Sequence, residues 1–208
     1  MSFIFKKKNI IKNINKNIIY SFDEAYILLK NLPFAKFKNS FESVDVAINL
    51  GVDVKKPDQN VRSSVVLPNG NGKVIKIAVF SDNDKEDLLK FGADFVGIDF
   101  LFDKISNGSI DFDVIISEPE SMKIISKLGP ILGPKGLMPN PKDGTVTKDL
   151  ISCLKRIKLG QVMYKTDKYG IIHSSVGRIN FDLYKIKANI ESLLNSIKKN
   201  KPVTSKGV

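Results

Sequence analysis

Hydrophobic and polar residues alternate in two regions near the ends of the chain, and this alternation predicts strands there. Residues 44–50 alternate in the manner of a half-buried strand, and a second extended segment covers 61–67. Residues 162–166 and 171–178 are predicted to be two further strands. The turn 167–170 between them has the composition of a hairpin turn.

One long helix is predicted beside each of these strand regions. Ser21 and Glu24 form a capping box, and Pro33 ends the helix that follows. Its apolar face is Ala25, Leu28, Leu29 and Leu32. Asp182 caps a last helix that Pro202 ends, with an apolar face of Leu183, Ile186, Ile190, Leu193, Leu194 and Ile197.

The middle of the chain alternates short strands with short helices. The predicted strands are 74–80, 95–97 and 114–116, and the predicted helices are 85–91, 100–105, 119–127 and 150–158. Such alternation predicts a small parallel sheet covered by helices. The economical architecture is an α/β protein with a discontinuous α+β domain, 1–67 plus 160–208, and an inserted Rossmann-like three-layer domain, 68–159.

The net charge of +11 over 208 residues, with a pI of about 9.6, points to a polyanionic partner. Residues 81–120 are an exception, because their eleven acids outnumber three lysines and give a net charge of −8. The rest of the chain is +19, which favours two modules with different surfaces over a single acidic face. The abundance of lysine, asparagine and isoleucine indicates an AT-rich coding sequence.

Enzymatic and metal chemistry has little support in the sequence. One histidine, His173, and one cysteine, Cys153, exclude an intrachain disulfide and a structural zinc site. Cys153 lies on an amphipathic segment and is expected to be a core residue. No apolar run is long enough to span a bilayer. We therefore expect no cofactor, no metal and no membrane partner.

Residues 127–147, called the signature loop below, contain four glycines and four prolines. This composition predicts neither helix nor strand. The apolar residues Leu128, Ile131, Leu132, Leu137 and Met138 predict that the loop is ordered rather than a linker. It is not a Walker loop, because no serine or threonine follows Lys135.

The hairpin turn is basic. Lys165, Lys168, Tyr169 and His173 lie on or near it, together with Asp167. Lysines suit phosphate contacts, and the rings suit stacking on an unpaired base or bonding a 2′-hydroxyl. An ordinary polar hairpin explains these residue types equally well.

The sequence closely resembles the L-one family of large-ribosomal-subunit proteins. The resemblance runs from about Tyr20 to Val208, and the signature loop is its most specific part. Its other blocks are Glu42-Ser-Val-Asp-Val-Ala-Ile-Asn-Leu-Gly51, Asp58-Gln-Asn-Val-Arg62, Val66-Leu-Pro-Asn-Gly-Asn-Gly-Lys73 and Asp167-Lys-Tyr-Gly-Ile-Ile-His173.

The resemblance implies a structural, non-enzymatic protein. It would bind the stalk region of large-subunit rRNA beside the tRNA exit site and assist release of deacylated tRNA; bacterial members also repress translation of their own mRNA. It implies a location on ribosomes, in the cytoplasm of an AT-rich bacterium or in an organelle matrix. The implied RNA contacts are Lys36, Phe37, Glu42, Ser43, Lys165, Asp167, Lys168 and His173. The implied signature positions are Gly129, Gly133, Pro134, Lys135, Gly136, Pro139, Asn140 and Pro141.

Two departures from the family pattern bear on these expectations. The residues Lys38-Asn-Ser40 separate Phe37 from the Glu42 block, so either Phe37 or Phe41 takes the family's aromatic RNA contact. The family continues after Lys-Gly-Val into a strand with a Thr-Met-Gly motif, and the sequence ends at Val208. We expect weaker rRNA binding from this, and a regulator not stably bound to ribosomes is the alternative. An enzyme using the middle domain is the rival from another class.

Overall fold

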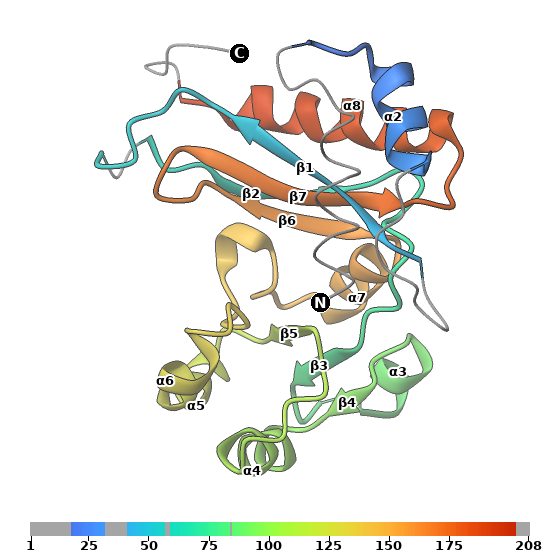
Figure 1. Cartoon of the computed structure of the whole chain (residues 1–208). Coiled ribbons are helices and arrows are strands. Elements are labelled where there is room, and N and C mark those ends of the chain that lie inside the picture. The colour runs from blue at the N-terminus through green and yellow to red at the C-terminus, as the bar shows by residue number, and fades with distance from the viewer. Residues whose placement is uncertain (1–17, 32–40, 57–58, 84, 203–208) are drawn as a thin grey trace, which may run out of the picture.

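The computed structural model describes residues 18–31, 41–56, 59–83 and 85–202. Two antiparallel strand pairs come from the two ends of the chain. Strand β1 (Ser43–Asn49) pairs with β7 (Ile171–Arg178), and β2 (Arg62–Val66) pairs with β6 (Gln161–Lys165). We call these four strands the antiparallel layer (Figure 1). The predicted strands at both ends of the chain are therefore confirmed.

Strands β6 and β7 meet at the predicted turn. An isolated bridge joins Thr166 to Ile172, and the amide of Asp167 donates to the carbonyl of Ile171 at 2.9 Å. Beyond this point, the two strands belong to different ladders, since β7 continues along β1 and β6 along β2. The hairpin is thus closed only at its turn.

Helices α2 (Phe22–Asn31) and α8 (Leu183–Asn200) cover one face of the antiparallel layer (Figure 1). The capping box is confirmed, because the Ser21 amide donates to Glu24 Oε2 and the Glu24 amide to Ser21 Oγ. A core cluster joins the two helices to the strands through Tyr26, Val44, Leu50, Val61, Tyr164, Ile172, Val176, Ile186, Leu193 and Ile197.

Two details of these helices differ from the prediction. Leu29 is half exposed, and Tyr26 takes the buried position because its hydroxyl donates to the carbonyls of Phe181 and Ile179. Asp182 stands at the N-cap of α8, but its side chain caps no amide and lies 3.7 Å from Lys185 Nζ. Leu32 and Pro33 lie outside the described residues.

The middle of the chain forms a parallel sheet of strand order β4-β3-β5. The strands are β3 (Ile77–Phe80), β4 (Phe95–Val96) and β5 (Val114–Ser117). Both faces of the central strand are buried, since Ile77 and Val79 contribute to one core cluster and Ala78 and Phe80 to another. The predicted strand from residue 74 begins late, at Ile77, because Val74 is almost fully exposed on the connection that precedes it.

Helices cover this sheet on its two sides. Residues of α3 (Lys85–Lys90) and α7 (Leu150–Lys158) pack into the first of those clusters, and residues of α4 (Ile98–Ser106) pack into the second. Cys153 is fully buried in the first cluster, as expected of a core residue, and burial raises the pKa of its thiol. The α/β fold class is confirmed.

The signature loop is folded, and part of the prediction for it is wrong. The predicted helix 119–127 begins only at α5 (Met122–Ile125) and continues as the 3₁₀ turn η2 (Ser126–Leu128). A further helical turn, α6 (Gly129–Leu132), follows inside the glycine- and proline-rich run, and η3 (Pro141–Asp143) comes later. Proline is tolerated in the first turn of a helix, and burial of Leu128 and Leu132 holds the run in place. The expected order of the loop is confirmed.

The chain crosses twice between the antiparallel layer and the parallel sheet, and the two crossings touch. The Leu67 amide donates to the carbonyl of Gly160 at 3.2 Å. A Cβ on Gly160, whose φ is +98°, would stand 2.5 Å from the Cα of Gly70. Separate core clusters on either side of the crossings support the discontinuous domain 1–67 plus 160–208 and the insertion 68–159, and that division remains a prediction.

Candidate nucleic-acid interface

The face of the antiparallel layer that points away from α2 and α8 is called the open face here. Side chains alternate across a strand, so the neighbours of the buried Tyr164 and Ile172 point to this face. Lys165 and His173 are exposed there, and Asp45 is exposed on β1. A shallow groove of about 350 Å³ runs along it, lined by Asp45, Val46, Ala47, His173, Ser174 and Ser175.

Asp167 shapes the turn at one end of the open face. Its Oδ1 accepts the amides of Tyr169 at 2.8 Å and Ile171 at 2.9 Å. These bonds, the one from Ile171 above all, lower the pKa of the Asp167 carboxyl. Oδ2 lies 3.5 Å from His173 Nε2. The family resemblance implies that Asp167 contacts RNA, and the geometry shows that Asp167 orders the turn.

The other predicted side chains at this end project outward. Lys168 is exposed and lies over the Tyr169 ring, with Nζ 5.0 Å from the ring centroid. Tyr169 is 70% exposed and the His173 side chain 63%. Lys165 is exposed on β6, directly opposite Arg62 of β2 in the ladder. The turn therefore gathers cations and two accessible rings on one edge.

Glu42 and Ser43 lie at the opposite end of the β1–β7 pair. The carbonyl of Glu42 accepts the amide of Ile179, and Ser43 Oγ donates to Asp45 Oδ2 at 3.1 Å. Phe41 is more than half exposed. A strand of this length separates the two ends by about 20 Å, so the structure groups the predicted contacts at two ends of one face. Lys36 and Phe37 lie outside the described residues.

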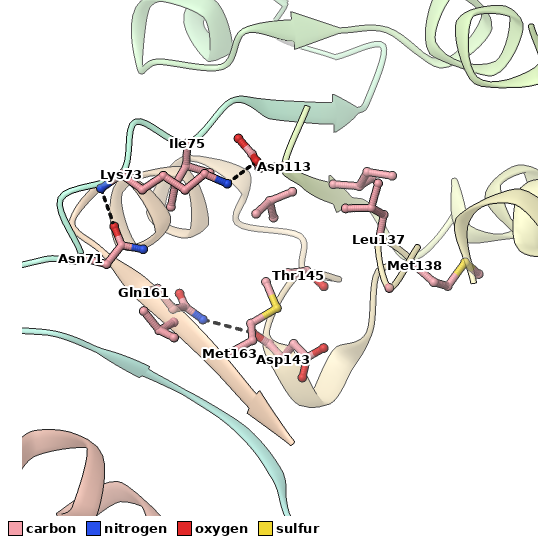
Figure 2. Close-up of a pocket in the computed structure, with 14 residues that line it drawn as sticks. Asn71, Lys73, Ile75, Asp113, Leu137, Met138, Asp143, Thr145, Gln161 and Met163 are labelled. Carbon is pink, nitrogen blue, oxygen red and sulfur yellow. Dashed lines mark hydrogen bonds and ion pairs between the residues drawn. The ribbon is translucent and has the colours of Figure 1, made fainter. Parts of the chain in front are cut away.

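A cleft of about 270 Å³ lies where the open face meets the signature loop and the parallel sheet (Figure 2). Gln161 and Met163 of β6 line one wall, Leu137 and Met138 of the signature loop another. Thr145 and the ion pair of Lys73 with Asp113 also line the cleft, and the figure draws Asn71, Ile75 and Asp143 beside them. No local sequence pattern indicates this cleft, because its walls come from segments distant along the chain.

The signature positions serve mainly to build the loop. Asn140 caps η3, since its Oδ1 accepts the Lys142 amide at 2.9 Å, and its own amide donates to Thr145 Oγ1. Pro139 is buried, and Pro141 begins η3. Gly136 has a φ of +70°, which glycine adopts without strain. Gly129, Gly133, Pro134 and Lys135 belong to or follow α6, and Lys135 is exposed.

The carboxyl ends of the parallel strands do not suit a nucleotide, although doubly wound sheets bind ligands there. Ser81, just after β3, is buried and donates to Glu118 Oε1, just after β5, at 2.6 Å. Asp82 and Glu120 are exposed close to these residues along the chain, and Lys85 pairs with Asp82 at 3.0 Å, so of these carboxylates Glu118 and Glu120 are left to repel a phosphate. Across residues 18–31, 41–56, 59–83 and 85–202, no group of three His, Cys, Asp or Glu side chains could hold a metal ion. No helix in those ranges is long and apolar enough to span a membrane.

Comparison with known proteins gives consistent matches. A model described as the ribosomal protein L1p/L10e family matches residues 28–208. The large ribosomal subunit protein uL1 of Pseudomonas fluorescens is 50% identical over 204 residues, covering 98% of this chain and 87% of that protein. The protein of the same name from Nitrosomonas europaea is 48% identical over 202 residues, covering 97% and 86%. That of Photobacterium profundum is 48% identical over 210 residues, covering 100% and 89%.

Proposed function

The chain belongs to the ribosomal protein L1p/L10e family and is a structural constituent of the large ribosomal subunit, not an enzyme, and we propose that its open face binds the rRNA stalk beside the tRNA exit site. One observation supports this site most directly. Lysines and two accessible rings gather on a strand face that the two long helices leave free. The basic charge outside residues 81–120 suits a phosphate backbone.

In this proposal the two ends of the open face have separate tasks. Lys165 and Lys168 contact phosphates, which position the protein without reading sequence. Tyr169 and His173 stack on unpaired bases or bond 2′-hydroxyl groups, which is how proteins read folded RNA. Glu42 and Ser43 make a second contact about 20 Å away. Lys36 and Phe37 or Phe41 extend that end, as the family resemblance implies.

The same surface accounts for the remaining proposed roles. Bound to a mobile stalk, the protein would help deacylated tRNA leave the exit site. An mRNA segment that imitates the rRNA site would bind the same residues, and translation of that message would be repressed. We place the protein on the ribosomes of a bacterial cytoplasm or an organelle matrix.

Binding of the purified protein to an rRNA stalk fragment, with excess tRNA as competitor at near-physiological salt, tests the proposal. We expect binding that tRNA does not displace. Lys165→Ala and Lys168→Ala should each weaken it and lower the salt slope by about one contact. Lys198→Ala is the matched control, because Lys198 is exposed on α8. Complete displacement by tRNA, or an equal effect of Lys198→Ala, would overturn the assignment.

Sedimentation with large subunits through a high-salt cushion separates the ribosomal role from that of a free regulator. A ribosomal constituent should sediment with the subunit. A protein that binds the stalk fragment but stays in the supernatant would support the regulator instead.

A further inference from the structure

Arg62 stands on the open face but is already paired. Its guanidinium meets the carboxylate of Asp143 in η3, with Nε 2.9 Å from Oδ1 and 3.1 Å from Oδ2, and Nη2 also donates to Oδ2. The two residues are 81 positions apart in the chain. The side chain of Asp143 is only 4% exposed, whereas that of Arg62 is 38% exposed. This fork joins a strand of the antiparallel layer to the signature loop.

A second tie holds the same turn of the loop. The buried side chain of Gln161, on β6, donates through Nε2 to the backbone carbonyl of Asp143 at 3.1 Å and to Ser64 Oγ at 2.8 Å. Figure 2 shows the bond from Gln161 to Asp143 at the edge of the cleft. Strand β2 therefore binds the side chain of Asp143, and the neighbouring strand β6 binds its backbone carbonyl.

The charges near this point favour retention of the pair. Arg62 faces Lys165 directly across the ladder, and like charges opposite one another are destabilising. The carboxylate of Asp143 neutralises one of them. Moving Arg62 to another anion would leave a buried carboxylate without its cation, which is strongly unfavourable. The hydrogen bonds that Arg62 donates to Asp143 also raise the pKa of the Arg62 guanidinium, so its charge stays fixed.

We propose that the Arg62–Asp143 ion pair is a latch that fixes the signature loop to the open face and keeps Arg62 from contacting an RNA phosphate. The second half of this statement rests on the proposed RNA-binding function, and the first half does not. Arg62 is then a positioning residue that lies among the proposed RNA contacts, and the neighbouring Lys165 is the cation available to an RNA phosphate.

Amide hydrogen exchange in the protein without RNA tests the latch. Arg62→Gln and Asp143→Asn should each speed exchange at Gly144 and Thr145 by about tenfold or more, since either change breaks an ion pair whose carboxylate is buried. Arg62→Lys keeps the charge but loses the fork, so its effect should be intermediate. Lys73→Gln removes the more exposed ion pair on the other wall of the cleft and should leave these amides unchanged. Unchanged exchange in both Arg62→Gln and Asp143→Asn would overturn the latch.

The salt dependence of binding to the stalk fragment tests whether Arg62 is withheld. Asp143→Asn should steepen the slope of log affinity against log salt by about one phosphate contact, because it releases Arg62. Arg62→Gln should leave the wild-type slope unchanged, while Lys165→Gln lowers it by about one. A lowered slope in Arg62→Gln would mean that Arg62 already contacts phosphate and would overturn this half. If the wild-type chain fails to bind the fragment, the RNA-binding proposal fails, and the exchange experiment still decides the latch.

Discussion

Replacing Asn189 by leucine would test how the bulge in β7 is stabilised. The β1–β7 register shifts between Val44 and Asp45, which leaves Val176 as the extra residue of β7. Asn189 of α8 is fully buried, and its Nδ2 donates to the carbonyl of Val176 at 2.8 Å and to that of Gly70 at 2.9 Å. Its Oδ1 accepts the amide of Asn69 at 3.1 Å. One side chain thus supports both the bulge and the first crossing.

The expected cost follows from what each partner loses. The Val176 carbonyl is buried and would be left without a donor, which costs about 1–3 kcal/mol. Gly70 and Asn69 are accessible enough for water to replace the amide, so each of those bonds is worth about 0.5–1.5 kcal/mol. Leucine has the same branching and number of side-chain heavy atoms as asparagine and is bulkier, so it leaves no cavity. We expect Asn189→Leu to lower the free energy of unfolding by about 2–6 kcal/mol.

Urea unfolding followed by circular dichroism measures this change, and a thermal melt should show a fall of roughly 4–24 °C in Tm for a chain of this size. Asn195→Leu is the matched control, because Asn195 is exposed on the same helix and should change stability by less than about 0.5 kcal/mol. If the two variants unfold at the same urea concentration, the bulge carbonyl is satisfied in another way and the reasoning is refuted.

Three further predictions concern the crossings, α2 and the basic turn. Gly160→Ala should destabilise the protein by about 2–5 kcal/mol, through backbone strain and the clash with Gly70. The control is Gly108→Ala, which is also at positive φ but in open space and should cost only about 1–2 kcal/mol. Equal urea midpoints for the two variants would contradict this prediction. Tyr26→Phe should cost about 1–2 kcal/mol in the same assay, because two carbonyls lose their donor, and no loss would mean that water replaces the hydroxyl. Asp167 has a lowered pKa in the folded state, so its stabilisation is present above the unfolded value of about 3.9 and is lost as pH falls through the folded pKa. Asp167→Asn should therefore be less stable than the wild type above about pH 5, and the difference should close as the pH falls through the folded pKa of Asp167; a difference that does not shrink in acid would contradict the assignment.

The sequence predicts those parts of the fold that depend on local periodicity. The alternation in β1 is visible because every second residue is buried against α2 and α8, and the capping box of α2 involves residues only three apart. The exclusion of helix from the signature loop was wrong at α6. Composition rules average over long helices and do not describe a single helical turn that has Pro130 as its second residue and buries Leu132.

The candidate site divides in the same way. The basic turn could be predicted, because its lysines and rings are neighbours in sequence. Three features could not be predicted from the sequence. They are the ion pair of Arg62 with Asp143, the cleft beside Gln161, and the burial of Asn189 on α8. Each depends on segments that only the tertiary fold brings together. Arg62 lies in a block of the family resemblance, but nothing in its neighbours along the chain indicates a partner 81 residues away.

The acidic segment, residues 81–120, favours one orientation of the protein as it approaches RNA. Its exposed carboxylates lie on α3, α4 and the loops around them, at the end of the protein remote from the antiparallel layer (Figure 1). A body with a net charge of +11 and a negative end carries a large electric dipole. In the field of a polyanion such a dipole experiences a torque, which turns the negative end outward before contact. Encounters with RNA would therefore begin with the antiparallel layer leading and the acidic end turned away, and a second RNA would meet a repelling surface on the far side.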